Sequence, residues 1–165
     1  HRLIRRQRQM CIRDRYYAAY FTVRSENLDG AIAMQGHQAV RDKMNNIKQK
    51  QSVHEATAKD EAEFQTLQIV NEMMARKIEF LPVDIYKSEA KMFKVEDGKI
   101  RLPFSSLPGV GGAAADSLAE TGKHTEYLSI EDMQIKTKVT KAVIETLKDV
   151  GVLKDLPESS QMSLF

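Results

Sequence analysis

Residues 104–118 read Phe-Ser-Ser-Leu-Pro-Gly-Val-Gly-Gly-Ala-Ala-Ala-Asp-Ser-Leu, a glycine-rich turn between an apolar segment and an alanine-rich run. Glycines let a backbone come close to a phosphate, and the helix that the alanines favour begins with unpaired N–H groups at its positive dipole end. The valine inside the turn is expected to point inward and hold the turn against the core. This pattern predicts an anion-binding junction formed by Gly109, Val110, Gly111, Gly112 and Ala113.

The same stretch resembles a helix-hairpin-helix, a motif that binds DNA without reading its sequence. Two other interpretations compete with this one. Gly109, Gly111 and Ala114 formally match a dinucleotide-binding fingerprint, but that fingerprint follows a buried strand, and residues 104–108 do not read as one. A plain glycine-rich connector between helices is the second alternative, and it stays open.

A second pair of helices is predicted after the alanine-rich run. Ser129-Ile-Glu-Asp132 has the form of a capping box with Asp in place of Glu, and Thr140 can cap a helix that stops at Gly151. The apolar positions of that last helix are Val143, Ile144, Leu147 and Val150. The lysines around the intervening turn are Lys136, Lys138 and Lys141. We expect Lys136 and Lys138 to lie beside the first turn's phosphate, with solvated surface as the alternative.

Helical patterns also precede the glycine-rich turn. Apolar residues at spacings of three and four predict an amphipathic helix over residues 29–48, followed by a polar loop over residues 48–59 and a long helix. The apolar stripe of the long helix is Phe64, Leu67, Val70, Met74 and Ile78. The aromatic run Tyr-Tyr-Ala-Ala-Tyr-Phe at residues 16–21 is expected in the core or between domains.

A short β-region separates the two helical parts. Residues 80–86 favour strands, and residues 91–96 face residues 99–103 across Asp97-Gly98, a strong signal for a two-residue hairpin. The predicted fold class is therefore α+β and mostly helical. It comprises a helical first part, a small β-hairpin unit, a helix-hairpin-helix domain and a flexible C-terminal tail.

The first fifteen residues differ from the rest of the chain. They hold six Arg and one Asp and show no helical or strand periodicity. They can be a basic arm that grips phosphates, but we favour sequence foreign to the protein, because residues 8–15 look like translated sequencing adapter. Without this segment 19 of the 25 basic and 22 of the 23 acidic residues remain, so the formal charge moves from +2 to −3. The overall charge is then no argument for nucleic acid.

The chain ends in a peptide that resembles the pentapeptide by which bacterial proteins bind the sliding clamp: Gln161, Met162, Ser163, Leu164 and Phe165. The three apolar side chains would enter a groove in extended form, and the glutamine amide would donate and accept at its edge. Residues 156–160 are polar and contain a proline, so we expect a tether that presents the peptide outward. A tail folded back onto the domain is the alternative.

Composition and motifs exclude several classes of protein. No apolar run approaches the ~20 residues that span a bilayer, and no secretory or lipidation signal is present. The single Cys11 excludes a disulfide framework and fits the cytoplasm. No Walker A loop, nucleophile elbow or Asp-x-Asp pair occurs, and His37, His54 and His124 are scattered. We expect no catalytic and no metal-ligating residues in this chain.

Four motifs in order carry a more specific resemblance. They are Tyr-Tyr-Ala-Ala-Tyr-Phe-Thr from Tyr16, Leu-Pro-Val-Asp-Ile-Tyr-Lys-Ser from Leu81, Pro-Phe-Ser-Ser-Leu-Pro-Gly-Val-Gly from Pro103, and the terminal pentapeptide. Together they resemble the carboxyl end of the PolC family of replicative DNA polymerases over about nine-tenths of the chain. The resemblance implies the end of the fingers region at 16–79, a duplex-binding domain at 80–155, and a tether with a clamp-binding tail at 156–165. Residues 1–15 would not belong to it.

The resemblance also implies partners. The glycine-rich turn would meet the backbone of new double-stranded DNA, and the tail would bind the sliding clamp (beta subunit), with other replisome subunits and no membrane involved. Catalysis by two divalent metal ions, expected to be Mg²⁺, would belong to sequence upstream, so this piece should hold no cofactor and be inactive alone. The alternatives are a non-catalytic DNA-binding adaptor that recruits a partner to the clamp, or a repair module with the same hairpin.

Overall fold

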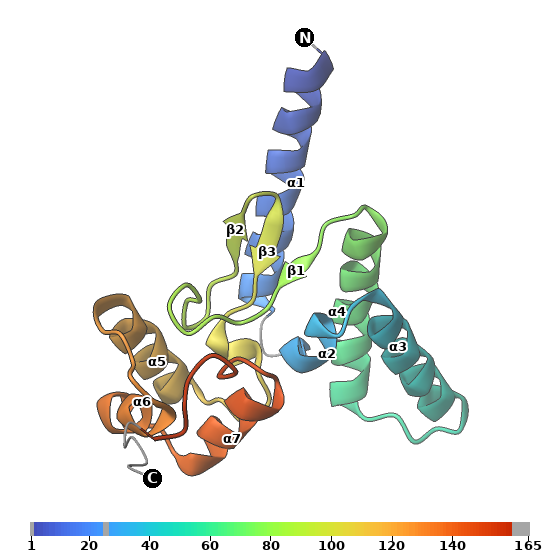
Figure 1. The fold of residues 1–165 in the computed structure, drawn as a ribbon. Coiled ribbons are helices and arrows are strands. Elements are labelled where there is room, and N and C mark those ends of the chain that lie inside the picture. The colour runs from blue at the N-terminus through green and yellow to red at the C-terminus, as the bar shows by residue number, and fades with distance from the viewer. Residues whose placement is uncertain (1, 25–26, 160–165) are drawn as a thin grey trace.

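The computed structural model describes residues 2–24 and 27–159, with side chains described from residue 12 onward (Figure 1). In chain order its elements are α1 (Arg2–Val23), α2 (Gly30–Met34), α3 (His37–Ser52), α4 (Ala58–Ala75), β1 (Phe80–Leu81), β2 (Lys94–Glu96), β3 (Lys99–Arg101), the 3-10 helix η2 (Phe104–Ser106), α5 (Gly112–His124), α6 (Ile130–Thr137) and α7 (Lys141–Asp149). The predicted α+β, mostly helical class is confirmed. None of the described helices is long and apolar enough to cross a membrane.

The first helical part, formed by α2, α3 and α4, is a small bundle that lies to one side of the sheet (Figure 1). The helix expected over residues 29–48 is broken at Gly36, whose φ of 98° is left-handed, so α2 and α3 are separate helices. The loop expected over residues 48–59 is shorter than predicted, because α3 continues to Ser52 and Thr57 already caps α4 in a capping box with Asp60. Of the predicted apolar stripe, Leu67 and Val70 are buried in α4, and Ile78 is buried beyond the end of this helix.

The sheet has the strand order β1-β3-β2 and lies in the middle of the molecule. β2 and β3 are antiparallel, with Val95 opposite Ile100, and β1 runs parallel to β3. Asp97 and Gly98 both have positive φ, as a type I′ hairpin turn requires, so the predicted hairpin is confirmed. Only two residues of the region 80–86 form a strand.

An aromatic cluster joins α1 to the sheet. The ring of Phe21, which is fully buried, lies 5.4 Å from that of Phe80 and 5.7 Å from that of Phe93. The expectation that the aromatic run at residues 16–21 is core is therefore confirmed for Tyr17, Ala18 and Phe21, whereas Tyr16 is 63% exposed. The rings pack across the predicted domain boundary at residues 79 and 80, and that boundary remains a prediction.

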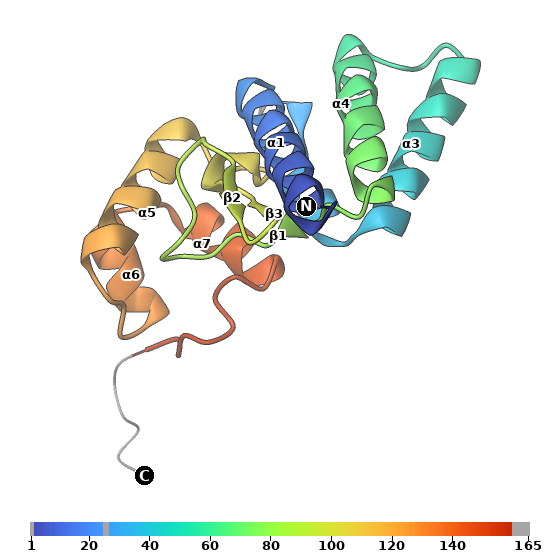
Figure 2. The ribbon, with the colours of Figure 1, turned by 90° about the horizontal axis from the view of Figure 1, so that it is seen from above.

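The helices α5, α6 and α7 form the second helical part on the opposite side of the sheet (Figure 2). Two glycines allow close contacts between elements. A Cβ on Gly122 of α5 would collide with the carbonyl oxygen of Ile85, and a Cβ on Gly30 of α2 would collide with Ser106 in η2. Gly122 thus lets α5 lie against the loop after β1, and Gly30 lets α2 lie against η2.

The first fifteen residues show no helical periodicity in the sequence, yet α1 extends back to Arg2. Once the buried aromatic residues anchor the end of α1, each further residue adds one backbone hydrogen bond at little cost, and Arg, Gln and Met favour helix. Whether residues 1–15 are native remains a prediction.

The expected free tether over residues 156–160 also differs from the structure. The amide of Ile130 donates to the carbonyl oxygen of Pro157 at 2.9 Å, and that of Glu131 donates to Glu158 at 3.3 Å. The side chain of Lys148 forms an ion pair with Glu158 at 2.8 Å. The chain is therefore bound to α6 and α7 as far as Glu158. The pentapeptide at residues 161–165 lies outside the described residues.

Candidate nucleic-acid interface

The first hairpin connects η2 to α5 through the predicted glycine-rich turn. Gly109 has a φ of 81°, a left-handed conformation that strains any residue with a Cβ. Val110 is only 7% exposed and donates its amide to Leu107 at 3.2 Å, so it points inward as expected. Gly109, Gly111, Gly112 and Ala113 are exposed around it.

The start of α5 is open on its outer side. Its N-cap residue, Gly111, makes no side-chain capping hydrogen bond, and a Cβ at this position would meet no atom within 4 Å. The first N–H groups of α5 therefore have no side-chain partner. Such an open helix start can accept an oxygen atom of an anion.

Lys91 lies at this helix start, although its position in the sequence did not point to it. Its Nζ and Cε atoms are 3.5 Å from where a Cβ of Gly112 would stand. A lysine at the positive end of a helix dipole is electrostatically unfavourable unless an anion binds between them. No pattern in the sequence links Lys91 to Gly112, because the loop before β2 brings them together.

A second hairpin between α6 and α7 repeats the geometry of the first. Lys138 is left-handed with a φ of 56°, Val139 is buried at 6% exposure, and Thr140 is the N-cap of α7. Thr140 has φ −72° and ψ 158°, almost the same as Gly111 with φ −71° and ψ 161°. The expected side-chain cap by Thr140 is absent, so α7 also starts without one.

The two hairpins are braced against each other. The hydroxyl of Ser117 in α5 donates to the carbonyl oxygen of Thr137, at the start of the second hairpin, at 2.6 Å. Thr146 of α7 lies against the first hairpin, with its Oγ1 3.7 Å from where a Cβ of Gly109 would stand. Ser117 and Thr146 each come six residues after the N-cap of their helix. The internal repeat is thus present in the packing as well as in the backbone.

The start of α6, by contrast, is fully occupied. The Ser129 side chain accepts from the amide of Asp132 at 3.1 Å, as the predicted capping box requires, but Asp132 in turn accepts from Leu128 rather than from Ser129. The two preceding amides, those of Ile130 and Glu131, donate to the carbonyl oxygens of Pro157 and Glu158, as described above. Hydrogen bonds from Lys136 and from the Leu128 amide lower the pKa of the Asp132 carboxyl. Only α5 and α7 of the second helical part start without a side-chain cap.

Lys136 and Lys138 were both expected beside the first hairpin. The ammonium of Lys136 is bound to Asp132 at 2.7 Å and to the carbonyl oxygen of Glu126 at 3.2 Å, so it is directed back along its own helix. Lys138 is exposed and belongs to the turn of the second hairpin. Lys141, the first residue of α7, is exposed as well.

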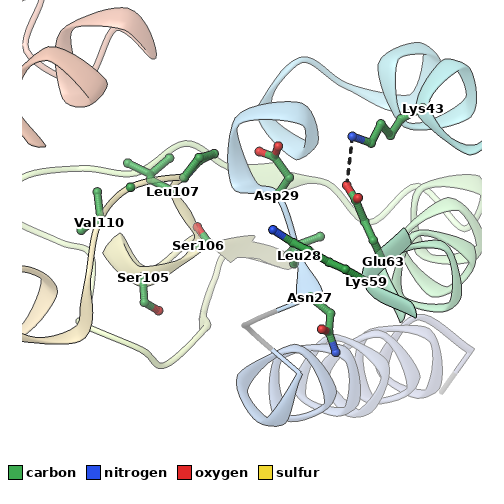
Figure 3. A pocket seen from close by; sticks show the side chains of 12 residues that line it. Asn27, Leu28, Asp29, Lys43, Lys59, Glu63, Ser105, Ser106, Leu107 and Val110 are labelled. Atoms are coloured by element: carbon green, nitrogen blue, oxygen red, sulfur yellow. Dashed lines mark ion pairs between the residues drawn. The ribbon is translucent and has the colours of Figure 1, made fainter. Parts of the chain in front are cut away.

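A cavity of about 370 Å³ separates the first hairpin from the bundle of α2, α3 and α4 (Figure 3). Its polar walls include Asp29, which caps α2, and Lys43, which forms an ion pair with Glu63 at 3.4 Å. In the described part of the chain, His, Cys, Asp and Glu side chains form no group of three that would hold a metal ion.

Comparison with known proteins places this geometry in a family. Residues 77–162 match the family described as helix-hairpin-helix motif. The chain is also similar to proteins named DNA polymerase III PolC-type, with 37% identity over 150 residues in Thermotoga maritima, 41% over 150 in Clostridium perfringens and 38% over 150 in Bacillus cereus. Each alignment covers 91% of this chain and 10% or 11% of the relative.

The chain therefore spans about a tenth of the length of the curated relatives that it matches. The family match covers the sheet, both hairpins and the chain bound along α6. The chain belongs to the helix-hairpin-helix motif family and is homologous to a segment of the PolC-type DNA polymerases III.

Proposed function

We propose that this chain holds the product duplex of a replicative DNA polymerase by its sugar–phosphate backbone and links the enzyme to its sliding clamp. The observation that carries the DNA-binding part is the repeated hairpin. Both α5 and α7 follow a left-handed residue and a buried valine, and both begin without a side-chain cap. Each start offers N–H groups to a phosphate.

Backbone amides bind phosphates without contacting bases, so we expect binding that is independent of sequence and sensitive to salt. Lys91 at the first hairpin and Lys138 and Lys141 at the second would supply the positive charge. Lys136, which is paired with Asp132, would contribute less than its position in the sequence suggested.

The clamp-binding part of the proposal rests on Gln161, Met162, Ser163, Leu164 and Phe165, which lie outside the described residues. Deleting residues 161–165 should abolish binding to the clamp. We expect micromolar affinity, because ordering a flexible tail offsets much of its contact energy. Unchanged affinity after the deletion would contradict this part of the proposal.

We assign no chemical step to this chain, and catalysis with divalent metal ions would belong to the rest of the polymerase. Primer extension should therefore be absent when this chain is assayed alone with template and nucleotides. The sequence similarity to PolC-type polymerases, in an alignment that covers 91% of the chain, favours this function over a separate adaptor or repair module.

The hairpin proposal is tested by Gly111→Asp, a change that separates binding from folding. The site is open and its φ of −71° suits any residue, so an aspartate there should cap α5 and raise the free energy of unfolding by up to about 1 kcal/mol. The same carboxylate would accept hydrogen bonds from the first amides of α5 and would repel phosphate. We therefore expect a more stable protein that binds duplex DNA more weakly in fluorescence anisotropy at low salt.

Gln51→Glu, which changes the net charge by the same amount at the exposed end of α3, is the matched control and should bind DNA like the parent. Lys91→Ala should weaken binding and reduce the salt slope by about 1, whereas Lys94→Ala, at the exposed position of β2, should do neither. If Gly111→Asp binds DNA as the parent does, the first hairpin is only a connector.

A further inference from the structure

A groove of about 210 Å³ lies between α3 and α4, in the helical part on the other side of the sheet from the two hairpins (Figure 2). The residues that line it are Arg41, Met44, Asn45 and Lys48 of α3 and Asn71 of α4. Two cations and two side-chain amides therefore surround the groove, and none of the described lining residues is acidic. The proposed contacts with duplex DNA and with the clamp use none of these side chains.

The two cations of the groove are not neutralised by ion pairs. α3 holds four lysine and arginine residues, and two of them pair with carboxylates of α4: Lys43 with Glu63 and Lys50 with Asp60. Among the described residues, Arg41 and Lys48 pair with no carboxylate. The ammonium of Lys48 lies over the ring of Phe64 instead, 5.8 Å from its centroid, and an aromatic ring holds a cation without removing its charge.

The amides add hydrogen-bond donors to these charges. Nε2 of His37 lies 2.7 Å from Oδ1 of Asn71, so the imidazole donates to the amide oxygen and leaves the Asn71 amino group to donate to a ligand. Asn45 lies one helical turn after Arg41 and adds a second amide on the same side of α3. A ligand that suits this groove is negatively charged and rich in acceptors, as the phosphates of a nucleic acid are.

The groove faces a different direction from the first hairpin. Lys43 of α3 lines the cavity beside that hairpin. Since successive residues of a helix are about 100° apart, Arg41 and Lys48 lie about 160° and 140° around α3 from Lys43. A duplex held by the hairpins would thus meet the Lys43 side of α3 rather than the groove. Nucleic acid that reaches the groove is then a different stretch from the one that the hairpins hold.

We propose that the groove between α3 and α4 binds single-stranded DNA through the phosphates of the unpaired template strand beside the duplex. This proposal rests on the proposed DNA binding by the hairpins, since the duplex supplies the adjoining strand. Arg41 and Lys48 are seven residues apart, about 11 Å along the helix axis, so they would contact different phosphates. Positively charged grooves that follow a single-stranded backbone bind it with little sequence preference.

The test measures binding of the whole chain to a blunt duplex and to the same duplex with an unpaired template extension, by fluorescence anisotropy at low salt. The extension should raise the affinity of the parent at least about fivefold, and Arg41→Gln combined with Lys48→Gln should remove most of this gain. The double variant should bind the blunt duplex like the parent. Its salt slope on the extended duplex should be lower by about 1.4, because each lost contact with a single strand contributes about 0.7.

The matched control is Lys94→Gln combined with Lys99→Gln, which removes the same charge at exposed positions of β2 and β3. It should keep the full gain from the extension. An extension that adds no affinity in the parent would overturn the proposal, and so would a double groove variant that keeps the gain. An equal loss on the blunt duplex would overturn it as well, because the groove would then belong to the duplex contact.

Gly111→Asp separates failure of this proposal from failure of the proposed function. It should weaken binding to the blunt duplex and leave the gain from the extension unchanged. If Gly111→Asp weakens duplex binding while the groove variant changes nothing, only the single-strand contact is wrong. If the groove variant loses the gain while Gly111→Asp binds the duplex like the parent, the hairpin proposal is wrong and the groove remains a DNA site.

Discussion

Left-handed residues mark both hairpins, but only one of them is a glycine. Gly109 has a φ of 81° at the first hairpin, and Lys138 has a φ of 56° at the equivalent place in the second. A Cβ strains this conformation by about 1–2 kcal/mol, so the second hairpin carries a backbone cost that the first does not.

We therefore expect opposite effects on stability at the two positions. Gly109→Ala should lower the free energy of unfolding by about 1–2 kcal/mol, and Lys138→Gly should raise it by up to about 1 kcal/mol. Urea denaturation followed by circular dichroism measures both. Equal stability of Gly109→Ala and the parent would show that the hairpin does not hold this conformation in solution.

Asp14 interrupts the buried stripe of α1. Tyr17, Ala18 and Phe21 are buried at helical spacing, and Asp14 occupies the preceding position of the same stripe at 1% exposure. Among the described residues its buried Oδ1 atom has no hydrogen-bond partner, and burial raises the pKa of its carboxyl. A carboxylate where an apolar residue would pack fits the hypothesis that residues 1–15 are foreign to this fold.

Asp14→Leu should raise the free energy of unfolding by about 1–3 kcal/mol at neutral pH, because it removes a buried and unsatisfied charge. The pKa is higher in the folded state than in the unfolded state, so the parent binds its proton more tightly when folded. The parent should therefore gain stability as the pH falls through the folded pKa, and the advantage of Asp14→Leu should shrink.

Denaturation midpoints at pH 7 and at a series of lower pH values measure this change. Arg15→Leu, on the exposed side of α1, is the control and should change stability by no more than about 0.5 kcal/mol. An Asp14→Leu protein less stable than the parent at pH 7 would mean that the carboxylate has a partner in solution.

At the scale of elements, α6 depends on residues far along the chain. Its first two amides are bound by the carbonyl oxygens of Pro157 and Glu158, and its last residue, Thr137, accepts from Ser117 of α5. The C-terminal chain thus completes a helix whose far end carries the second hairpin.

Removing residues 157–165 should expose the amides of Ile130 and Glu131. We expect both to exchange hydrogen slowly in the whole chain and quickly after this truncation, as measured by NMR. A truncation that removes only residues 160–165 should leave both protected. If these amides exchange quickly in the whole chain, the anchor described here does not persist in solution.

At the scale of the whole molecule, the repeat predicts that both hairpins hold one duplex. Gly111→Asp and Thr140→Asp place a carboxylate at equivalent helix starts. Each should weaken DNA binding and lower its salt slope, and the double variant should show a further loss in both, because each hairpin contacts its own phosphates. Binding that depends on Gly111 alone would restrict the contact to the first hairpin.

Local signals in the sequence accounted for much of the fold. Four predicted features that depend on a few neighbouring residues are present: the Asp97-Gly98 turn, the Ser129 cap, the end of α7 before Gly151 and the inward Val110. The predicted fold class and the family resemblance are also confirmed. The single helix expected over residues 29–48 is wrong, because the left-handed backbone at Gly36 divides it.

The first hairpin and its buried valine could be predicted from the sequence, because glycine, valine and alanine have strong local conformational preferences. The second hairpin was not recognised as a repeat, since Lys138, Val139 and Thr140 share only the valine with the first. The two hairpins are equivalent in their backbone angles, and a lysine and a threonine do not indicate such angles in a sequence.

Three further contacts join residues that are distant in the sequence: Lys91 beside Gly112, the hydrogen bond from Ser117 to Thr137, and the C-terminal chain bound to α6. Such contacts follow from the packing of the helices on the sheet, and no local pattern encodes them.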